Sequence, residues 1–331
     1  MLCKDFLNGL HCNILSTVTQ TEDEDTWLKN RTNGIGGSDI GTICGVNQFS
    51  SPRLLYLSKL GMYEDESADR TAAKERMHFG KVLEPIVADE FAIRSGLRVA
   101  VSPATYQHKE IEWALANIDR FIIDEEGRPY GILECKTSSE FMNNDWFEGD
   151  FSLSYLYQVQ WYMFVTGLRV AHIAVIVGGN KFYSYEIPYN IELVKGTLLP
   201  SAEYFWEENI KKLIEPQIDG SEASTNFLKS QYAECVKNSE IQLLDETTND
   251  LANLIVESKK KVKALEATIA EAENRIKEKM KDTEIAYTID RTCKWSPRSQ
   301  MRVSTDLLKA NFPDVYEACK HQINYRVFTV K

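Results

Sequence analysis

The chain has 331 residues, of which 43% are hydrophobic and 26% are charged. This balance is typical of a soluble globular protein with one large domain or two ordinary ones, and no run approaches the roughly 18 apolar residues of a membrane span. The formal net charge of −11 argues against a protein that passively coats nucleic acid.

Seven cysteines lie far apart in the sequence, and no two of them form a CxxC pair. Their number and spacing favour neither a disulfide framework nor a zinc or iron–sulfur cluster. The N-terminal stretch MLCKDFLNGLHCNIL contains one lysine and an interrupted apolar run, which makes a poor secretory signal. We therefore expect a cytoplasmic protein with reduced thiols and no membrane attachment.

The N-terminal part of the sequence predicts short helices around a glycine-rich turn. Residues 1–25 carry little pattern and are expected to form an arm. The segment TWLKNRTNGIGGSDIGTICG (26–45) predicts a helix, a glycine-rich turn, and a second helix capped by Ser38 or Asp39. The segment SPRLLYLSKLG (51–61) predicts another helix, bounded by a proline and a glycine.

The middle of the chain alternates helical and strand patterns. In chain order these patterns predict a helix, three strands, a helix, a hairpin and a closing helix, at residues 75–96, 113–118, 121–124, 130–137, 152–167, 171–189 and 191–214. This order predicts an α/β (α+β) core in which a mixed, largely antiparallel sheet is covered by helices.

The last third of the chain has a different pattern. From Leu251 onward apolar residues recur in steps of four and three, the spacing of a coiled-coil seam. We expect coiled-coil helices over about 248–281, then a small β-hairpin, a helix over 306–319 and a terminal strand over 325–331. Helices that pack on their own domain would give the same spacing. The expected divisions are an arm, a core and a C-terminal extension, at residues 1–25, 26–220 and 221–331.

A charged pair lies inside the apolar strand predicted at 130–137. In GILECKTSS, Glu134 and Lys136 are separated by one residue, so their side chains share one face of the strand. Asp119 ends the preceding strand pattern ALANID, and Glu84 lies on the apolar helix before it. Taken singly, each of these residues has a plainer explanation, such as an exposed ion pair or a turn residue.

Together the charged residues suggest a cation site. Three carboxylates that converge on one place repel each other by several kcal/mol unless a cation lies between them. Carboxylate oxygens suit Mg²⁺ or Mn²⁺, and a lysine beside them can orient an attacking water or stabilise charge that grows on a phosphate. The residues therefore predict metal-assisted hydrolysis of a phosphodiester.

Asp119, Glu134 and Lys136, preceded by a helical glutamate, resemble the core motif of the PD-(D/E)xK nuclease superfamily. Five segments also resemble, in order and spacing, the phage-type alkaline exonucleases, a group of lambda-exonuclease-like enzymes and YqaJ-like viral recombinases: GIGGSD, FGKVLEP, LANIDRFI, GILECKT and YLYQVQWYMFVTG. The resemblance covers roughly residues 27–190 and implies a restriction-endonuclease-like core, with the coiled coil and small β elements as an extension.

The resemblance implies a role for each matching residue. Asp119 and Glu134 are expected to bind a metal together with the main-chain carbonyl of Cys135. Glu84 is expected to bind a second metal or to act through its water. Mg²⁺ is the expected cofactor, with Mn²⁺ able to substitute for it.

The resemblance also implies roles in handling water and DNA. Lys136 is expected to position and activate the attacking water, which Gln158 helps to order. Arg31 and Ser38 flank the glycine-rich turn and match the residues that hold the 5′-phosphate in this family. An arginine beside a turn rich in N–H groups suits an anion on physical grounds as well.

The function implied is that of a Mg²⁺-dependent exodeoxyribonuclease, which degrades double-stranded DNA 5′→3′ from its ends and leaves 3′ single-stranded tails for phage-type homologous recombination. The expected partners are DNA ends, a single-strand annealing protein of the RecT or Red-beta type, and further copies of the chain in a ring-shaped homo-oligomer. The expected location is the cytoplasm of a bacterial host, with the gene carried by a phage or prophage. Two alternatives remain: a PD-(D/E)xK endonuclease of restriction or junction type, and a non-catalytic recombination adaptor.

Overall fold

The computed structural model describes residues 10–18, 23–63, 68–102, 104–322 and 325–330. The chain forms two compact units, Met1–Leu228 and Lys229–Lys331. The boundary expected from the sequence, after residue 220, lies within the first unit.

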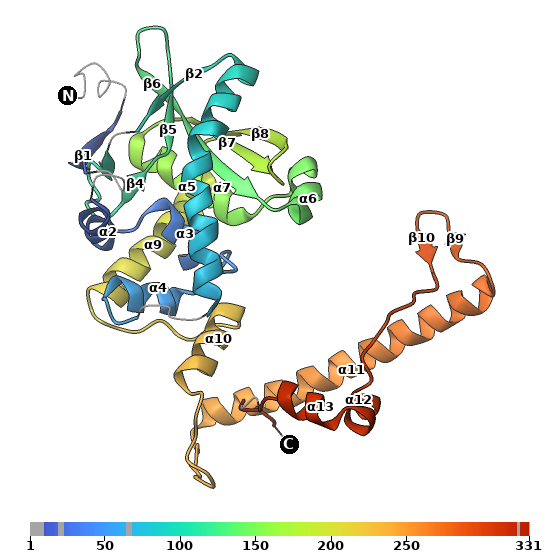
Figure 1. Cartoon of the computed structure of the whole chain (residues 1–331). Helices are drawn as coiled ribbons and strands as arrows, with labels where there is room; N and C mark the ends of the chain where they lie inside the picture. Colours follow the sequence, from blue (N-terminus) through green and yellow to red (C-terminus); the bar gives the residue numbers. More distant parts are fainter. Residues whose placement is uncertain (1–9, 19–22, 64–67, 103, 323–324, 331) are drawn as a thin grey trace. The chain divides into compact units, whose positions relative to one another are not determined.

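The first unit is built around a five-stranded sheet in the order β2–β5–β6–β7–β8 (Figure 1). Its strands are β2 (Arg98–Val101), β5 (Arg120–Ile123), β6 (Pro129–Ser138), β7 (Val170–Val177) and β8 (Lys181–Pro188). β6 and β7 run parallel, and the other three neighbouring pairs are antiparallel. The parallel crossover contains η1 (Glu140–Met142), α6 (Asn143–Glu148) and α7 (Leu153–Thr166), since parallel strands need a long connection. The predicted mixed sheet flanked by helices is confirmed.

Helices cover both faces of this sheet because its central strands are apolar on both sides. In β5, Phe121 and its neighbour Ile122 point to opposite faces and belong to two separate apolar clusters. On the Ile122 face packs α5 (Ala68–Ser95), which contributes Phe91. On the Phe121 face packs α7, which contributes Trp161.

A separate three-stranded sheet has the order β1–β3–β4, with β1 (Cys12–Ser16), β3 (Thr105–His108) and β4 (Leu115–Asn117). β4 corresponds to the strand predicted at 113–118, and it pairs with β3 and not with β5. The predicted arm contains β1, which pairs antiparallel with β3. Its half-buried Cys12 and Ile14 pack against the core, and this burial of alternate residues explains why the segment is a strand.

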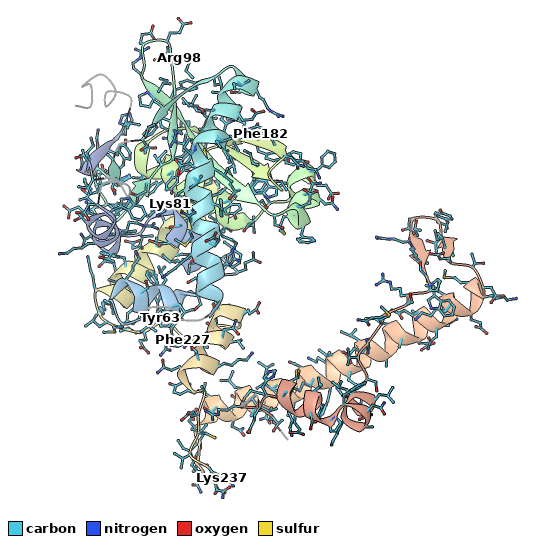
Figure 2. The ribbon with its side chains drawn as sticks, in the orientation of Figure 1. Tyr63, Lys81, Arg98, Phe182, Phe227 and Lys237 are labelled. Atoms are coloured by element: carbon cyan, nitrogen blue, oxygen red, sulfur yellow. The ribbon has the colours of Figure 1, made fainter. Side chains whose placement is uncertain are left out.

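Further helices complete the first unit. Around the glycine-rich turn lie α2 (Glu24–Thr32), α3 (Gly37–Ile43) and α4 (Pro52–Lys59). The predicted closing helix is a continuous run of α and π segments: α8 (Ile191–Leu193), η2 (Val194–Leu198), α9 (Leu199–Tyr204) and η3 (Phe205–Ile210). After it comes α10 (Glu222–Gln231), where Phe227 packs edge-on against Tyr63 with ring centroids 5.3 Å apart (Figure 2).

The second unit contains α11 (Glu246–Met280) and a hairpin of β9 (Ile285–Tyr287) and β10 (Thr292–Lys294). The helix predicted over 306–319 is split into α12 (Thr305–Asn311) and α13 (Pro313–Cys319), because a proline inside a helix removes a hydrogen bond and clashes with the preceding turn. The terminal strand predicted over 325–331 is wrong for residues 325–330, which hold no strand. The sheet of the hairpin contains β9 and β10 alone, so this segment does not pair with it.

No helix in the described part of the chain is long and apolar enough to cross a membrane. The six cysteines among the described residues are free thiols. Cys3 lies outside the described residues.

The glycine-rich turn between α2 and α3 is attached to the core by hydrogen bonds. The Ile35 N–H donates to the Trp113 carbonyl at 2.6 Å, and the Leu115 N–H donates to the Ile35 carbonyl at 2.9 Å. The buried indole N–H of Trp161 donates to the Ile35 and Leu115 carbonyls, each at 3.1 Å. These bonds hold the turn against β4 and α7.

Glycines let α3 approach α7 closely. A Cβ added at Gly37 would lie 2.3 Å from a ring carbon of Tyr162, and one added at Gly41 would lie 2.4 Å from the hydroxyl of Ser154. Gly37 and Gly41 are four residues apart and therefore share the face of α3 that meets α7. Ser38, next to Gly37, is exposed beside this contact.

A buried ion pair joins α4 to the turn. Asp39 Oδ2 accepts the Gly36 N–H at 2.9 Å and lies 2.9 Å from Lys59 Nζ, which also donates to the carbonyls of Gly34 at 2.6 Å and Arg31 at 3.1 Å. Burial alone raises the pKa of Asp39. The charges of Lys59 and Arg31 and the Gly36 N–H outweigh burial and hold the pKa below its ordinary value of 3.8.

We expect Asp39→Asn to lower the free energy of unfolding by about 3 kcal/mol at neutral pH, because it leaves the Lys59 ammonium buried without its counter-charge. Folding lowers the pKa of Asp39, so its stabilisation is complete above the ordinary value of 3.8 and is lost as the pH falls through the folded-state pKa. Urea unfolding followed by far-UV circular dichroism measures the difference between wild type and variant from pH 7 downward.

The matched control is Asp89→Asn, on an exposed position of α5, which is expected to change the free energy of unfolding by less than about 0.5 kcal/mol. A difference between wild type and Asp39→Asn that persists unchanged well below pH 3 contradicts the ion-pair explanation.

Candidate active site

A pocket of about 450 Å³ lies beside the turn, and its volume falls in the range of about 300–1,000 Å³ found for small-ligand sites. α5 contributes Lys81, which Figure 2 labels. The lining includes residues predicted to belong to the site: Arg31, Ser38, Glu84, Asp119 and Gln158. Segments far apart in the sequence therefore bring these side chains to one place.

Arg31 and Ser38 form one wall of the pocket. Arg31 Nη2 donates to Ser38 Oγ at 2.6 Å, and its guanidinium lies over the Trp27 ring, 4.6 Å from the centroid. Arg31 lies in the last turn of α2 and Ser38 in the first turn of α3, so the anchored turn holds the two side chains together. A guanidinium beside a hydroxyl is suited to binding the oxygens of a phosphate.

Glu134 and Lys136 project from the same face of β6 and are in contact. Lys136 Nζ lies 2.6 Å from Glu134 Oε1 and 4.7 Å from the centroid of the Tyr155 ring. Gln158 of α7 bridges the pair, since its Nε2 donates to Glu134 Oε1 at 2.7 Å and its Oε1 accepts from Lys136 Nζ at 3.1 Å. The same Nε2 lies 2.9 Å from the Tyr162 hydroxyl. This network fixes the amide of Gln158 between the strand and the pocket.

Asp119 is the residue just before β5, and it is joined to β6. Its Oδ2 accepts the main-chain N–H of Cys135 at 2.8 Å. Burial raises the pKa of Asp119 well above its ordinary value, and the charges of Glu134 and Glu84 raise it further. Two predicted metal ligands therefore lie close enough to repel each other.

The two charged residues of β6 both have raised pKa values, but for different reasons. Burial raises the pKa of Glu134 above its ordinary value, although Lys136 and the Gln158 amide oppose this shift. Burial by itself lowers the pKa of Lys136, but the carboxylates of Glu134 and Asp119 outweigh it and raise the pKa. The lysine consequently remains a cation beside the two acids.

Glu84 is held by an arginine that the motif comparison did not identify. Arg120, the first residue of β5, forms an ion pair with Glu84 and donates to the Asp119 carbonyl at 2.7 Å. The Arg120 side chain is only 11% exposed. The available sequence signal was a charged residue directly after Asp119, at the start of an otherwise apolar strand.

A divalent cation fits the acids of this site. Glu134 Oε2 is buried without a hydrogen-bond partner, which is costly for a carboxylate oxygen unless something binds it. Carboxylate and main-chain oxygens are the ligands that Mg²⁺ and Mn²⁺ prefer. Within the described ranges, no three His, Cys, Asp or Glu side chains gather at metal-ligand spacing. The expected convergence of three carboxylates is therefore not observed, since Arg120 holds Glu84. Asp119, Glu134 and a main-chain oxygen are the donor set that fits.

Comparison with known proteins finds a matching family model and a similar bacterial protein. A family model described as the YqaJ-like viral recombinase domain matches residues 26–169. The protein YqaJ of Bacillus subtilis (strain 168) is 38% identical over 309 residues, which make up 93% of this chain and 94% of that protein.

Two solved structures resemble part of the chain at low sequence identity. The alkaline exonuclease LHK-Exo from Laribacter hongkongensis matches with a TM-score of 0.45 and 17% identity, over 63% of this chain and 98% of that one. A phage-related exonuclease from Haemophilus somnus 129PT matches with a TM-score of 0.41 and 14% identity, over 55% of this chain and 96% of that one. On its 38% identity to YqaJ over nearly the full length of both chains, this protein belongs to the YqaJ-like viral recombinase family, as its motifs predict.

Proposed function

We propose that this protein is a Mg²⁺-dependent exodeoxyribonuclease that degrades double-stranded DNA 5′→3′ and leaves 3′ single-stranded tails for homologous recombination. The observation that carries the proposal is the hydrogen-bonded group of Glu134, Lys136 and Gln158, of which Gln158 lines a pocket together with Asp119, Arg31 and Ser38. A family of viral recombinases is a setting in which DNA ends are processed.

Asp119, Glu134 and the main-chain carbonyl of Cys135 are the proposed metal ligands. The free Oε2 of Glu134 supports this assignment. The ion would neutralise the two acids and act as a Lewis acid toward the phosphate, and Mn²⁺ could replace Mg²⁺.

Lys136 and Gln158 are proposed to hold the attacking water. The Lys136 ammonium donates, and the Gln158 amide can both donate and accept, so together they can orient a water molecule between the strand and the pocket. The charge of Lys136 would also stabilise the negative charge that develops on the phosphate oxygens. Glu84, through its ion pair with Arg120, is proposed to act on a second metal or its water from the α5 side.

Arg31 and Ser38 are proposed to bind the terminal 5′-phosphate. Their contact with each other and their place on the pocket wall support this role. An anion site at one side of the pocket would select a strand end over an internal phosphodiester, which favours an exonuclease over an endonuclease. A non-catalytic adaptor would have no use for buried acids, which cost folding free energy.

The proposed partners rest on the family resemblance. They are double-stranded DNA ends, a single-strand annealing protein of the RecT or Red-beta type, and further copies of the chain in a ring. The proposed location is the cytoplasm of a bacterial host that carries the phage or prophage.

We expect Lys136→Met to lower the rate of cleavage of linear duplex DNA by about a hundredfold or more, because the charge that orients water and stabilises the phosphate is removed. Binding to DNA ends should remain. Lys181→Met, on β8 of the same sheet, where Lys181 pairs with Glu140 and not with the acids of the site, is the control and should cleave normally. End-labelled duplex assayed with Mg²⁺ and with EDTA reports both effects. Equal cleavage in EDTA, or by the Lys136 variant, contradicts the proposed site.

Arg31→Ala should abolish any preference for 5′-phosphorylated over 5′-hydroxyl ends, with a loss of about tenfold to a hundredfold on phosphorylated ends, since one charge-assisted hydrogen bond contributes about 1.5–3 kcal/mol. The control is Arg128→Ala, whose exposed side chain pairs with Asp124 and Glu126 away from the pocket. Initial rates on two duplexes that differ only in the 5′ group measure the preference. A variant that retains the wild-type preference contradicts the phosphate site.

Covalently closed circular DNA distinguishes an exonuclease from an endonuclease. We expect the circle to remain intact under conditions that degrade the same plasmid after it has been cut once, because a closed circle has no end to occupy the Arg31 side of the pocket. Gel electrophoresis of both substrates over time gives the result. Nicking or linearisation of the circle at a comparable rate would assign the endonuclease function instead.

A further inference from the structure

The long helix α11 carries an apolar stripe that its own unit leaves uncovered. Leu251, Val262, Leu265 and Ile269 are each more than half exposed, at 55%, 53%, 62% and 58%. Large apolar side chains at regular spacing along one helix face are typical of a surface that another helix covers. Figure 1 shows α11 as one long helix of the second unit, leading to the hairpin of β9 and β10.

The spacing of the stripe assigns heptad positions without ambiguity. Steps of four and three from Leu251 put β-branched residues at every a position and leucine or small residues at the d positions. The a positions are Ile255, Val262, Ile269 and Ile276, and the d positions are Leu251, Ser258, Leu265 and Ala272. Among parallel coiled coils, β-branched residues at a with leucine at d, as at Leu251 and Leu265, favour two strands over three or four.

The flanking charges suit a second copy of the same helix. In a parallel pair each g residue faces the e residue five positions further along the partner helix. Lys261 would therefore meet Glu266 of the second copy, and the reciprocal pair forms by symmetry. The other g residues of the stripe face an uncharged residue or are uncharged themselves, so no like-charge pair opposes association.

The chain's own segments cover the helix only near its two ends, where Met280 is buried at the C-terminal end. Thr248, Ala252, Ile255 and Val256 are half-buried, whereas residues 257–276 are exposed throughout. The uncovered stretch includes Val262, Leu265 and Ile269, the middle of the seam. Something outside the unit must cover these residues if they are to leave water.

We propose that α11 pairs with α11 of a second copy as a parallel two-stranded coiled coil, with a seam over residues 251–276, about 39 Å long. The proposal does not depend on the nuclease activity. Ser258 and Ala272 contribute little apolar area to the seam, so the pair should be reversible and depend on concentration. The coil would bring two copies of the pocket into one assembly.

Cysteine cross-linking of the full chain tests the pairing and its direction. In a parallel coil equivalent d residues lie opposite each other, within reach of a disulfide. We expect Ser258→Cys and Ala272→Cys each to give a covalent dimer on mild oxidation, with mass spectrometry identifying the link between identical positions. Ala267→Cys, on the outer f position, is the matched control and should give no such link. The native cysteines are common to all three variants and to the parent.

Two outcomes of that experiment overturn the proposal. One is a lack of 258–258 and 272–272 links above the level of the control. The other is a link between positions 258 and 272 when the two variants are mixed, since this requires an antiparallel pair. The cross-link reports on α11 alone, whatever contacts the first unit makes between copies.

Sedimentation velocity of the full chain provides an independent test. The double variant Leu265→Glu/Ile269→Glu places four like charges in the seam and should move the protein to a smaller assembly at concentrations where the parent is associated. Ala267→Glu/Ala270→Glu adds the same charge on the outer face and should sediment as the parent does. Circular dichroism verifies that α11 stays helical in both. A parent that stays monomeric, or a double variant that associates as the parent does, overturns the proposal.

Discussion

The repulsion between two buried acids governs the architecture of the site. Asp119 directly precedes β5 and Glu134 lies on the neighbouring strand β6, and burial raises the pKa of both. The charge of Lys136, on the same face of β6, opposes this shift at both acids, and the amide of Gln158 opposes it at Glu134. Arg120 neutralises the third acid, Glu84. Replacing such a group by apolar side chains commonly stabilises a protein. Buried charges retained at this cost, beside a pocket, are better explained by chemistry than by folding.

One helix, α7, contacts both the acid–lysine pair of β6 and the glycine-rich turn between Arg31 and Ser38. Within little more than one turn of α7, Gln158 binds the acid and the lysine of β6, and Trp161 donates to the carbonyl that anchors the glycine-rich turn. Tyr162, four residues after Gln158 on the same face of α7, hydrogen-bonds to Gln158, and its ring lies where a side chain at Gly37 would be. The distance from the Arg31 side to the Lys136 side is therefore set by a rigid element, which is what a site that holds a strand end in register with a reacting bond needs.

The parts of the site that follow from local periodicity were predictable, and the parts that depend on tertiary contacts were not. Strand alternation alone puts Glu134 and Lys136 on one face, and the structure has them in contact. Motif order added the remaining residues and the family, which is confirmed. The ion pairs Arg120–Glu84 and Lys59–Asp39 were not predicted, because the sequence position of a charged residue does not identify its partner in the fold. The pairing of β1 with β3 was not predicted for the same reason. The two strands lie some ninety residues apart in the sequence, and the five residues of β1 are too few for a clear strand pattern.

The two units differ in how far they bury their apolar side chains. In the first, the apolar strands of the sheet are covered by α5 on one face and by α7 on the other. In the second, α11 carries a regular seam of which the middle remains in water. Helical propensity alone supports isolated helices only marginally, and most helices draw their stability from packing an apolar face. A 35-residue helix with an uncovered seam therefore points to association, its β-branched a positions favour two strands, and the Lys261–Glu266 pairing favours a second copy in parallel.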